Sequence, residues 1–81
     1  MPEVIEEKVL STNEPMPIAN LLRNAELVES TSDAYRAIDQ GGVRIDGEKV
    51  LDRNLKIATG TEHIYQVGKR KFLKIFLKKR D

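Results

Sequence analysis

Three consecutive cations follow a glycine near the end of this sequence: Gly68 is followed by Lys69, Arg70 and Lys71. Glycine adopts the positive φ that the first central position of a type II′ turn requires, so Gly68-Lys69 predicts a two-residue hairpin turn. Such a turn projects the three cations from a rigid tip. Because lysine and arginine match the oxygens of backbone phosphates, the tip is a candidate site for a polyanion.

Two further cations, Arg36 and Arg44, lie on either side of the Gly41-Gly42 pair. We place Arg36 on a helix and Arg44 on the following strand, so the turn between them can bring both side chains to one edge. Glycine loops that bind nucleotides open a helix, whereas this pair follows one. The pattern therefore favours a basic binding surface over a nucleotide site.

Residue types used in catalysis are scarce. His63 is the only histidine and there is no cysteine. A lone histidine in a strand is more often a surface or packing residue than a catalytic group or metal ligand. The paired acids Glu6 and Glu7 fall in a linker-like segment. We therefore predict no catalytic residue, no metal site and no cofactor in this chain, which by itself is not an enzyme.

Charge is divided unevenly along the 81 residues, a length that allows one small domain. Residues 1–40 carry three bases against eight acids, a balance of −5, and residues 41–81 carry eleven against five, a balance of +6. This asymmetry indicates a polyanionic partner, nucleic acid before an anionic membrane surface. The structural alternative is a strand edge whose lysines deter edge pairing. The final segment alternates with period two, which disfavours a membrane-surface helix.

Two helices are expected in the first half of the chain. The first begins near Pro17, because proline is tolerated in the first helical turn, and apolar residues follow it at helical spacing. The second is capped by Ser30, whose hydroxyl can accept from the N–H of Asp33 while the Asp33 carboxylate reaches back to Ser30. Gly41 ends this helix, since glycine enters the left-handed region freely.

Strands are expected from residue 43 onward. Asp46-Gly47 is a strong hairpin signal between residues 43–45 and a return at 49–51. The remaining residues predict a loop at 52–62 and two strands, at 63–67 and 70–77. A two-residue turn in the last hairpin would pair Tyr65 with Phe72 and Ile64 with Leu73. Two packed helices followed by a small, largely antiparallel sheet make an α+β fold.

The aromatic residues are few, which bears on the kind of nucleic acid. A platform that stacks unpaired bases needs exposed rings on one face. We expect Tyr65 and Phe72 to serve as core or cross-strand packing residues instead. Binding to structured RNA through shape and phosphate is therefore favoured over binding to a splayed single strand.

The chain divides into three segments by composition. Residues 1–14 form a lead-in, either a short strand or a flexible linker, and residues 15–77 form the domain. Residues 78–81 form a basic C-terminal tail. Pro15 and Pro17 separate the lead-in from the domain.

Residues 27–50 resemble the core motif of the ribosomal-protein-S-four-like RNA-binding domain, also called the alpha-L motif. The family shows a serine-capped basic helix followed by Gln-Gly-x-Val-x-Val/Ile-Asn/Asp-Gly. Residues 15–22, 46–52 and 66–72 are similar to the version of this domain in tyrosyl-tRNA synthetases. The resemblance covers most of residues 15–77.

The resemblance carries expectations about function. It implies that the full enzyme attaches tyrosine to its tRNA using ATP, and that this domain sits last in the chain and holds tRNA(Tyr) near its long variable arm and anticodon side. It implies no DNA or membrane partner, a homodimeric parent enzyme and a monomeric isolated domain. The cytoplasm is the expected location, with a mitochondrial or plastid matrix as the alternative.

The resemblance also assigns RNA-binding residues. The matching positions are Ser30, Ser32, Arg36, Gln40, Arg44, Lys69, Arg70 and Lys71. This helix departs from the family, which often reads Ser-Lys/Arg-Ser-Glu-Ala-Arg-Arg. Thr31 and Tyr35 replace two bases and Asp39 adds an acid, so the positive charge on the helix is reduced. Tyr35 can stack on RNA, bond to a sugar, or simply cover the helix.

Two other functions remain open from the sequence. One is a stand-alone protein of the same fold that acts on ribosomal RNA, which an ordered segment 1–14 would favour over an appended domain. The other is a protein-interaction or dimer-stabilising domain, in which the C-terminal lysines serve solubility.

Overall fold

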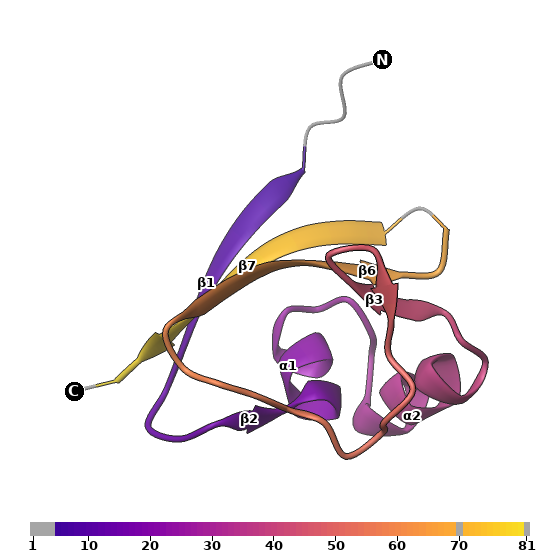
Figure 1. Ribbon diagram of the computed structural model, residues 1–81, viewed down its shortest axis with the longest axis horizontal. Coiled ribbons are helices and arrows are strands. Elements are labelled where there is room, and N and C mark those ends of the chain that lie inside the picture. Colours follow the sequence, from indigo (N-terminus) through magenta and orange to yellow (C-terminus); the bar gives the residue numbers. More distant parts are fainter. Residues whose placement is uncertain (1–4, 70, 81) are drawn as a thin grey trace.

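The computed structural model describes residues 5–69 and 71–80. Within them, two helices lie against one face of a five-stranded sheet with the order β1-β7-β6-β3-β4, and a two-stranded sheet joins β2 to β5 (Figure 1). The elements are β1 (Glu6–Thr12), β2 (Met16–Pro17), α1 (Ile18–Asn24), α2 (Thr31–Asp39), β3 (Val43–Ile45), β4 (Glu48–Lys49), β5 (Lys56–Ile57), β6 (Thr61–Val67) and β7 (Lys71–Lys79). The predicted α+β class is confirmed.

Helix α1 begins where proline predicted it. Pro17 is its N-cap residue, and the helix buries one apolar side completely, with Ile18, Leu21 and Leu22 at 0% exposure. Beyond its C-cap, Glu26 adopts a left-handed φ of 65°, and the N–H of Leu27 donates to the carbonyl of Leu22 at 3.0 Å. This is the glycine position of a helix-ending motif, here occupied by a glutamate.

Helix α2 is capped as the sequence predicted at its start. The Ser30 hydroxyl accepts from the N–H of Asp33 at 3.2 Å. Among the described residues, the reciprocal bond from the N–H of Ser30 to the Asp33 carboxylate does not form. At the other end, Gly41 has a φ of +73° and Gly42 donates its N–H to the carbonyl of Ala37 at 2.8 Å, so the glycine stop is confirmed.

The hairpins of the sheet follow the predicted order, and only the last one departs from the predicted register. Asp46 and Gly47 both have positive φ values, 52° and 89°, as a type I′ turn requires. In the last hairpin, Tyr65 pairs with Leu73 and Gln66 with Phe72. The predicted pairing of Tyr65 with Phe72 and of Ile64 with Leu73 is therefore wrong by one residue.

The core explains this register. Tyr65 is 1% exposed, and Leu73, Ile75 and Leu77 of β7 are all buried toward the helices. A pairing of Tyr65 with Phe72 would place Tyr65 on the opposite face from Leu73, since side chains alternate along a strand. Three residues, 68–70, therefore lie between Val67 and Lys71, the last paired residues of this hairpin. Phe72 is 41% exposed on the outer face, where it pairs with Gln66, so of its two predicted roles the core one is wrong; the core position of Tyr65 is confirmed.

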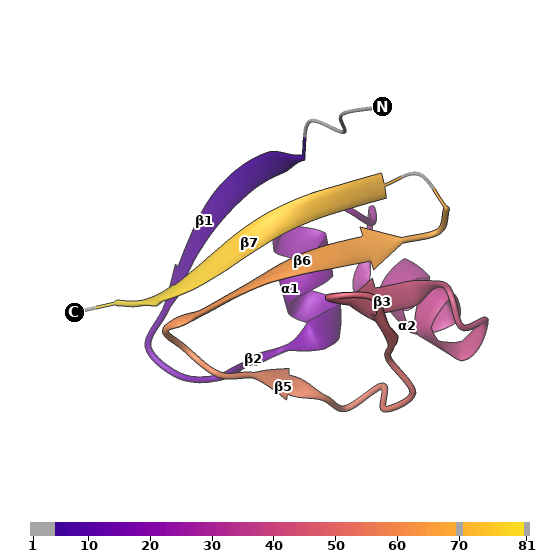
Figure 2. The same cartoon turned by 45° about the horizontal axis from the view of Figure 1, so that its top comes forward.

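Strand β1 lies parallel to β7 along its whole length, from Glu6 opposite Leu73 to Thr12 opposite Lys79 (Figure 2). Of the two alternatives for the lead-in, the short strand is the one observed for residues 6–12. Sheet pairing thus extends past the predicted divisions at residues 14 and 77, and the division into three segments stays a prediction. Strand β5 lies inside the predicted loop 52–62, where Lys56 pairs with Pro17.

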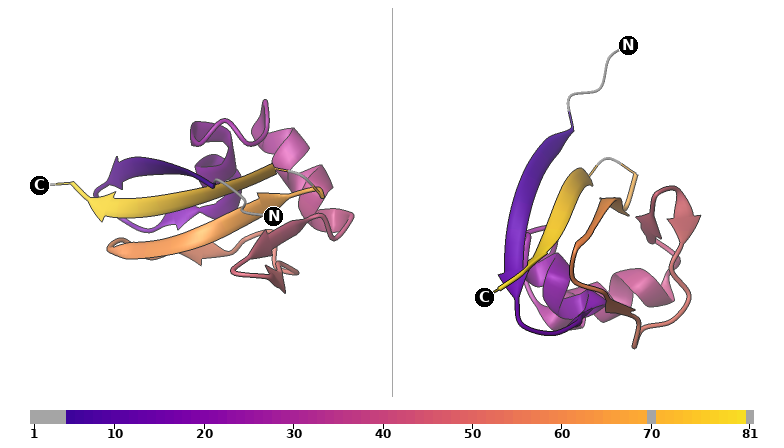
Figure 3. Two further views of the ribbon diagram at one scale, coloured as in Figure 1. Left: turned by 90° about the horizontal axis from the view of Figure 1, so that it is seen from above. Right: turned by 60° about the vertical axis from the view of Figure 1, so that its left-hand side comes forward.

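Both views of Figure 3 show the helices on one side of the curved sheet, which leaves the other side open. That outer face carries Val9, Phe72 and Phe76, all exposed, and an ion-paired Lys74 whose Nζ lies 3.6 Å from carboxylate oxygens of Glu7 and of Glu62. Within residues 5–69 and 71–80, no helix is both long and apolar enough to cross a membrane.

Candidate nucleic-acid interface

The hairpin after β6 is fastened to the end of α2 by one backbone hydrogen bond. The N–H of Gly68 donates to the carbonyl of Gly42 at 2.7 Å. The bond continues the pairing of Val43 with Val67 between β3 and β6. The two segments joined in this way line a surface hollow, here called the tip hollow. Its lining residues are Gln40, Gly41, Gly42, Arg44, Gln66, Gly68 and Lys69.

Three of the predicted binding residues therefore meet in the tip hollow: Gln40, Arg44 and Lys69. Arg44 and Lys69 are exposed, so both cations can reach a ligand in solvent. The amide nitrogen of Gln66 donates to the carbonyl of Gly68 at 2.8 Å, which ties β6 to the hairpin loop. Arg44 and Lys69 flank a hollow whose lining includes glycine backbone, and two cations in this arrangement are suited to binding phosphate oxygens.

A second hollow lies along α2 and shares Gln40 with the first. This α2 hollow is lined by Ser32, Tyr35, Arg36, Asp39, Gln40 and Arg53. Arg36 and Arg44 thus line two adjoining hollows rather than one edge. Ser30 lies at the start of α2, where its hydroxyl serves as the helix cap.

Lys71 does not join this group. Lys71 begins β7 and lines a different hollow with Glu6, Glu7 and Glu26. Carboxylates beside it oppose the approach of a phosphate, so Lys71 is poorly placed for that role. Arg70 lies outside the described residues.

Two basic residues that the sequence analysis did not select stand beside the predicted ones. Lys49 of β4 pairs with Arg44 of β3, and its Nζ lies 3.2 Å from the place where a Cβ at Gly41 would stand. The Asp46-Gly47 turn fixes this pairing, so the sequence held the signal for Lys49. Arg53 comes from a loop, and its guanidinium carbon lies 4.8 Å from the centroid of the Tyr35 ring. No periodic pattern pointed to that contact.

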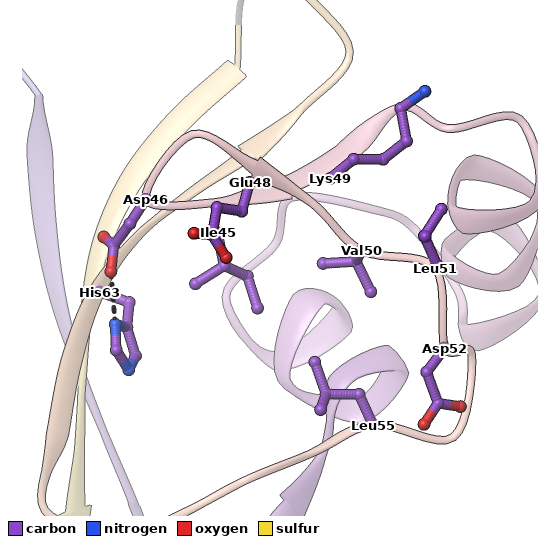
Figure 4. Close-up of a pocket in the computed structure, with 9 residues that line it drawn as sticks. All are labelled: Ile45, Asp46, Glu48, Lys49, Val50, Leu51, Asp52, Leu55 and His63. Atoms are coloured by element: carbon purple, nitrogen blue, oxygen red, sulfur yellow. Dashed lines mark hydrogen bonds and ion pairs between the residues drawn. The ribbon is translucent and has the colours of Figure 1, made fainter.

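A third hollow lies next to the Asp46-Gly47 turn, and its lining is more acidic than that of the tip hollow (Figure 4). Three carboxylate residues, Asp46, Glu48 and Asp52, line it, together with Lys49, His63 and the 82% exposed Leu51. Figure 4 shows the His63 ring turned toward Asp46, with 2.7 Å between Nδ1 and Oδ2. The acidic lining makes this hollow unsuited to a phosphate, and His63 here supports the turn.

The Asp46 carboxylate is stabilised in its ionised form. The backbone N–H of Ile64 donates to it at 2.9 Å and His63 adds a second hydrogen bond, and these bonds hold the pKa of Asp46 below its ordinary value. On the inner face, burial foremost and the nearby Asp46 charge raise the pKa of Tyr65 to about 12. Among residues 5–69 and 71–80, no cluster of three or more metal-ligating side chains is present.

Two helices on a mostly antiparallel sheet, with cations gathered where a glycine turn meets a hairpin, define a small RNA-binding module. The S4 domain model matches residues 16–63, which is more than half of the chain. The chain belongs to the S4 domain family.

Relatives narrow the comparison further. The chain is 56% identical over 70 residues to the tyrosine–tRNA ligase of Francisella tularensis, a match that covers 86% of this chain and 18% of the relative. It is 51% identical over 77 residues to the tyrosine–tRNA ligase of Shewanella oneidensis, a match that covers 95% of this chain and 19% of that enzyme. It is 41% identical over 81 residues to the tyrosine–tRNA ligase of Legionella pneumophila, a match that covers 100% of this chain and 20% of that enzyme. The chain thus spans about a fifth of the length of these enzymes.

The match to the Legionella enzyme includes the whole of β1. An ordered segment at this position therefore does not favour a stand-alone protein over a domain of a longer enzyme. In this structure the segment supplies an edge strand to the domain's own sheet.

Proposed function

We propose that this domain holds tRNA(Tyr) for a tyrosyl-tRNA synthetase, whose full-length enzyme ligates tyrosine to tRNA with ATP. The observation that carries the proposal is the Gly68–Gly42 hydrogen bond, which joins the basic hairpin to the end of α2 and places Arg44 and Lys69 around one hollow. The identity to tyrosine–tRNA ligases supports the choice of enzyme.

The proposed ligand is the phosphate backbone of structured RNA, near the long variable arm and anticodon side of the tRNA. The binding residues are Ser32, Arg36, Gln40, Arg44 and Lys69, with Ser30 as a contact from the helix cap and Lys49 as an addition. Arg70 and Lys71 stay in the proposed set on the resemblance of their motif, and the carboxylates around Lys71 rank it lowest.

The remaining expectations belong to the same proposal. The domain acts without a cofactor of its own, while ATP is used by the catalytic part of the parent enzyme. The parent enzyme is a homodimer in the cytoplasm of a bacterium, and an organelle matrix is the alternative. The isolated domain is a monomer that binds neither DNA nor membranes.

Titration of the purified domain with tRNA(Tyr) and with an unrelated tRNA, at two salt concentrations, tests the proposal. About five phosphate contacts to looped RNA give a log–log salt slope near −3.5. Salt-sensitive binding that prefers tRNA(Tyr) supports the proposal. Equal binding to both tRNAs keeps RNA binding but removes the specific partner, and ribosomal RNA then becomes the next ligand to test.

Charge reversal provides the matched test on the protein side. Arg36→Glu and Lys69→Glu should each weaken tRNA binding while the thermal midpoint stays close to that of the unchanged domain, because both side chains are exposed. Unchanged binding in both variants contradicts the proposal. No binding by the unchanged domain at low salt would favour a protein-interaction role.

A further inference from the structure

The α2 hollow contains an arginine whose guanidinium lies over a tyrosine ring. The guanidinium carbon of Arg53 lies 4.8 Å from the centroid of the Tyr35 ring, within the range of a cation–π contact. Tyr35 is partly buried and packs against the core, so its ring is a fixed support. The Arg53 side chain keeps 54% of its surface exposed.

A cation–π contact occupies one side of a guanidinium and leaves N–H donors available to another ligand. The N–H donors of arginine lie in the plane of the group, so an arginine held in this way can still bond two oxygens of one phosphate. Ser32, Arg36 and Gln40 line the same hollow, and they supply a hydroxyl, a second cation and an amide. This donor set matches a phosphate group of an RNA backbone.

One acid in the hollow competes for the arginine. Asp39 Oδ1 lies 3.8 Å from Arg53 Nε, which is longer than a hydrogen bond, and both side chains are more than half exposed. An exposed contact of this length holds the arginine weakly. A phosphate that arrives in the hollow can therefore replace Asp39 as the partner of Arg53.

We propose that Arg53, positioned by Tyr35, binds a backbone phosphate of RNA in the α2 hollow beside Arg36. This inference rests on the proposed RNA-binding function and deepens it. It also gives a reason for the unusual helix sequence. The cation absent at position 35 is supplied from the loop after β4, and the aromatic ring at that position holds it in place.

Removal of the charge gives the first test. Arg53→Gln should weaken RNA binding about fivefold and reduce the salt slope by about 0.7 to 0.9, the share of one phosphate contact. The loss should be similar for tRNA(Tyr) and an unrelated tRNA, because phosphate contacts carry no sequence information. Lys78→Gln is the matched control. Lys78 is exposed and pairs with Ser11, at the end of β7 opposite to Lys71.

Variants of the neighbours separate positioning from mere packing. Tyr35→Leu should weaken binding, whereas Tyr35→Phe should keep it, because phenylalanine retains the aromatic face. Asp39→Asn should strengthen binding, because Arg53 then has no competing carboxylate. Both effects should disappear in an Arg53→Gln background. Effects that persist without Arg53 would overturn the role given to the cation–π contact.

Nuclear magnetic resonance of the labelled domain distinguishes this inference from the proposed function. An RNA hairpin of unrelated sequence should shift the Arg53 side-chain Nε–H signal. A shift at Arg53 without preference for tRNA(Tyr) would sink the specific tRNA function and leave the phosphate site standing. Shifts at Arg44 and Lys69 with an unmoved Arg53 signal would overturn the site and leave the RNA-binding function standing.

Discussion

Asp46 accepts two hydrogen bonds from consecutive residues of β6. His63 Nδ1 lies 2.7 Å from Oδ2, and the backbone N–H of Ile64 donates to Oδ1 at 2.9 Å. Since an ionised carboxylate can only accept, Nδ1 of His63 carries the proton of the first bond. The turn between β3 and β4 is thereby tied to the long hairpin, and the lone histidine has a structural role.

This relationship predicts a response to acid. The pKa of Asp46 is lowered from 3.8, chiefly by the Ile64 N–H and then by His63, so the folded state favours the ionised carboxylate. Its contribution to stability is present above pH 3.8 and is lost as the pH falls through the lower folded-state pKa. Asp46→Asn should lower the urea midpoint at pH 7 and have a smaller effect near pH 3. Glu48→Gln, an exposed change two residues away, is the control. An equal decrease of the urea midpoint at both pH values would contradict a stabilising role of the ionised Asp46 carboxylate in these two hydrogen bonds.

Tyr65 predicts a response to alkali. Burial first, and the Asp46 charge second, raise its pKa to about 12, above the ordinary 10.0 of an unfolded chain. The unfolded state therefore loses its proton first, and stability is full below pH 10.0 and declines as the pH approaches about 12. Tyr65→Phe should flatten this decline while retaining the buried ring, as measured by denaturation from pH 8 to 11. A decline of unchanged steepness would assign it to other groups.

The left-handed backbone of Glu26 predicts that glycine is more stabilising than alanine at this position. Its φ of 65° places a side chain in the left-handed region at the end of α1, at a cost of about 1 kcal/mol relative to glycine. Glu26→Gly should therefore be more stable than Glu26→Ala by about 1 kcal/mol in urea denaturation. The alanine variant is the control because both variants lose the 3.2 Å ion pair with Lys8. Equal stabilities would mean that the backbone conformation costs little here.

Lys69 and Lys71 predict unequal effects on RNA binding, although they belong to one basic run. Lys69 lines the tip hollow with Arg44, whereas Lys71 lies with the carboxylates of Glu7 and Glu26. Lys69→Gln should weaken tRNA binding about fivefold, and Lys71→Gln should weaken it by less than twofold. Filter binding at two salt concentrations measures both. A larger loss for Lys71 would mean that RNA enters from the β1 side.

Some of the architecture was readable from local chemistry. Proline at the start of α1, the Ser30 cap, the Gly41 stop and the Asp46-Gly47 turn each act within a few residues, so their physics is contained in the sequence. The period-two alternation of the final segment likewise indicated the strand β7. The α+β class followed from the order of these signals, and the RNA-binding family from the resemblance of residues 27–50.

The register of the last hairpin was misread because a local turn rule was used alone. The shared face of Tyr65 and Leu73 outweighs the preference of Gly68-Lys69 for a two-residue turn, since a slip of one residue would expose the core side chains of one strand. The same core requirement places Phe72 outside.

The sequence by itself determined the start of both helices, the Gly41 stop, the Asp46-Gly47 turn and the presence of a basic surface, because each depends on neighbours in the chain. Tertiary structure alone decided that β1 pairs with β7, that Gly68 bonds Gly42, that Lys71 is separated from Lys69, and that Arg53 lies over the Tyr35 ring. These are contacts between residues far apart in the sequence or set on different elements. They form only when burial of the shared core brings those elements together, and no local pattern records that arrangement.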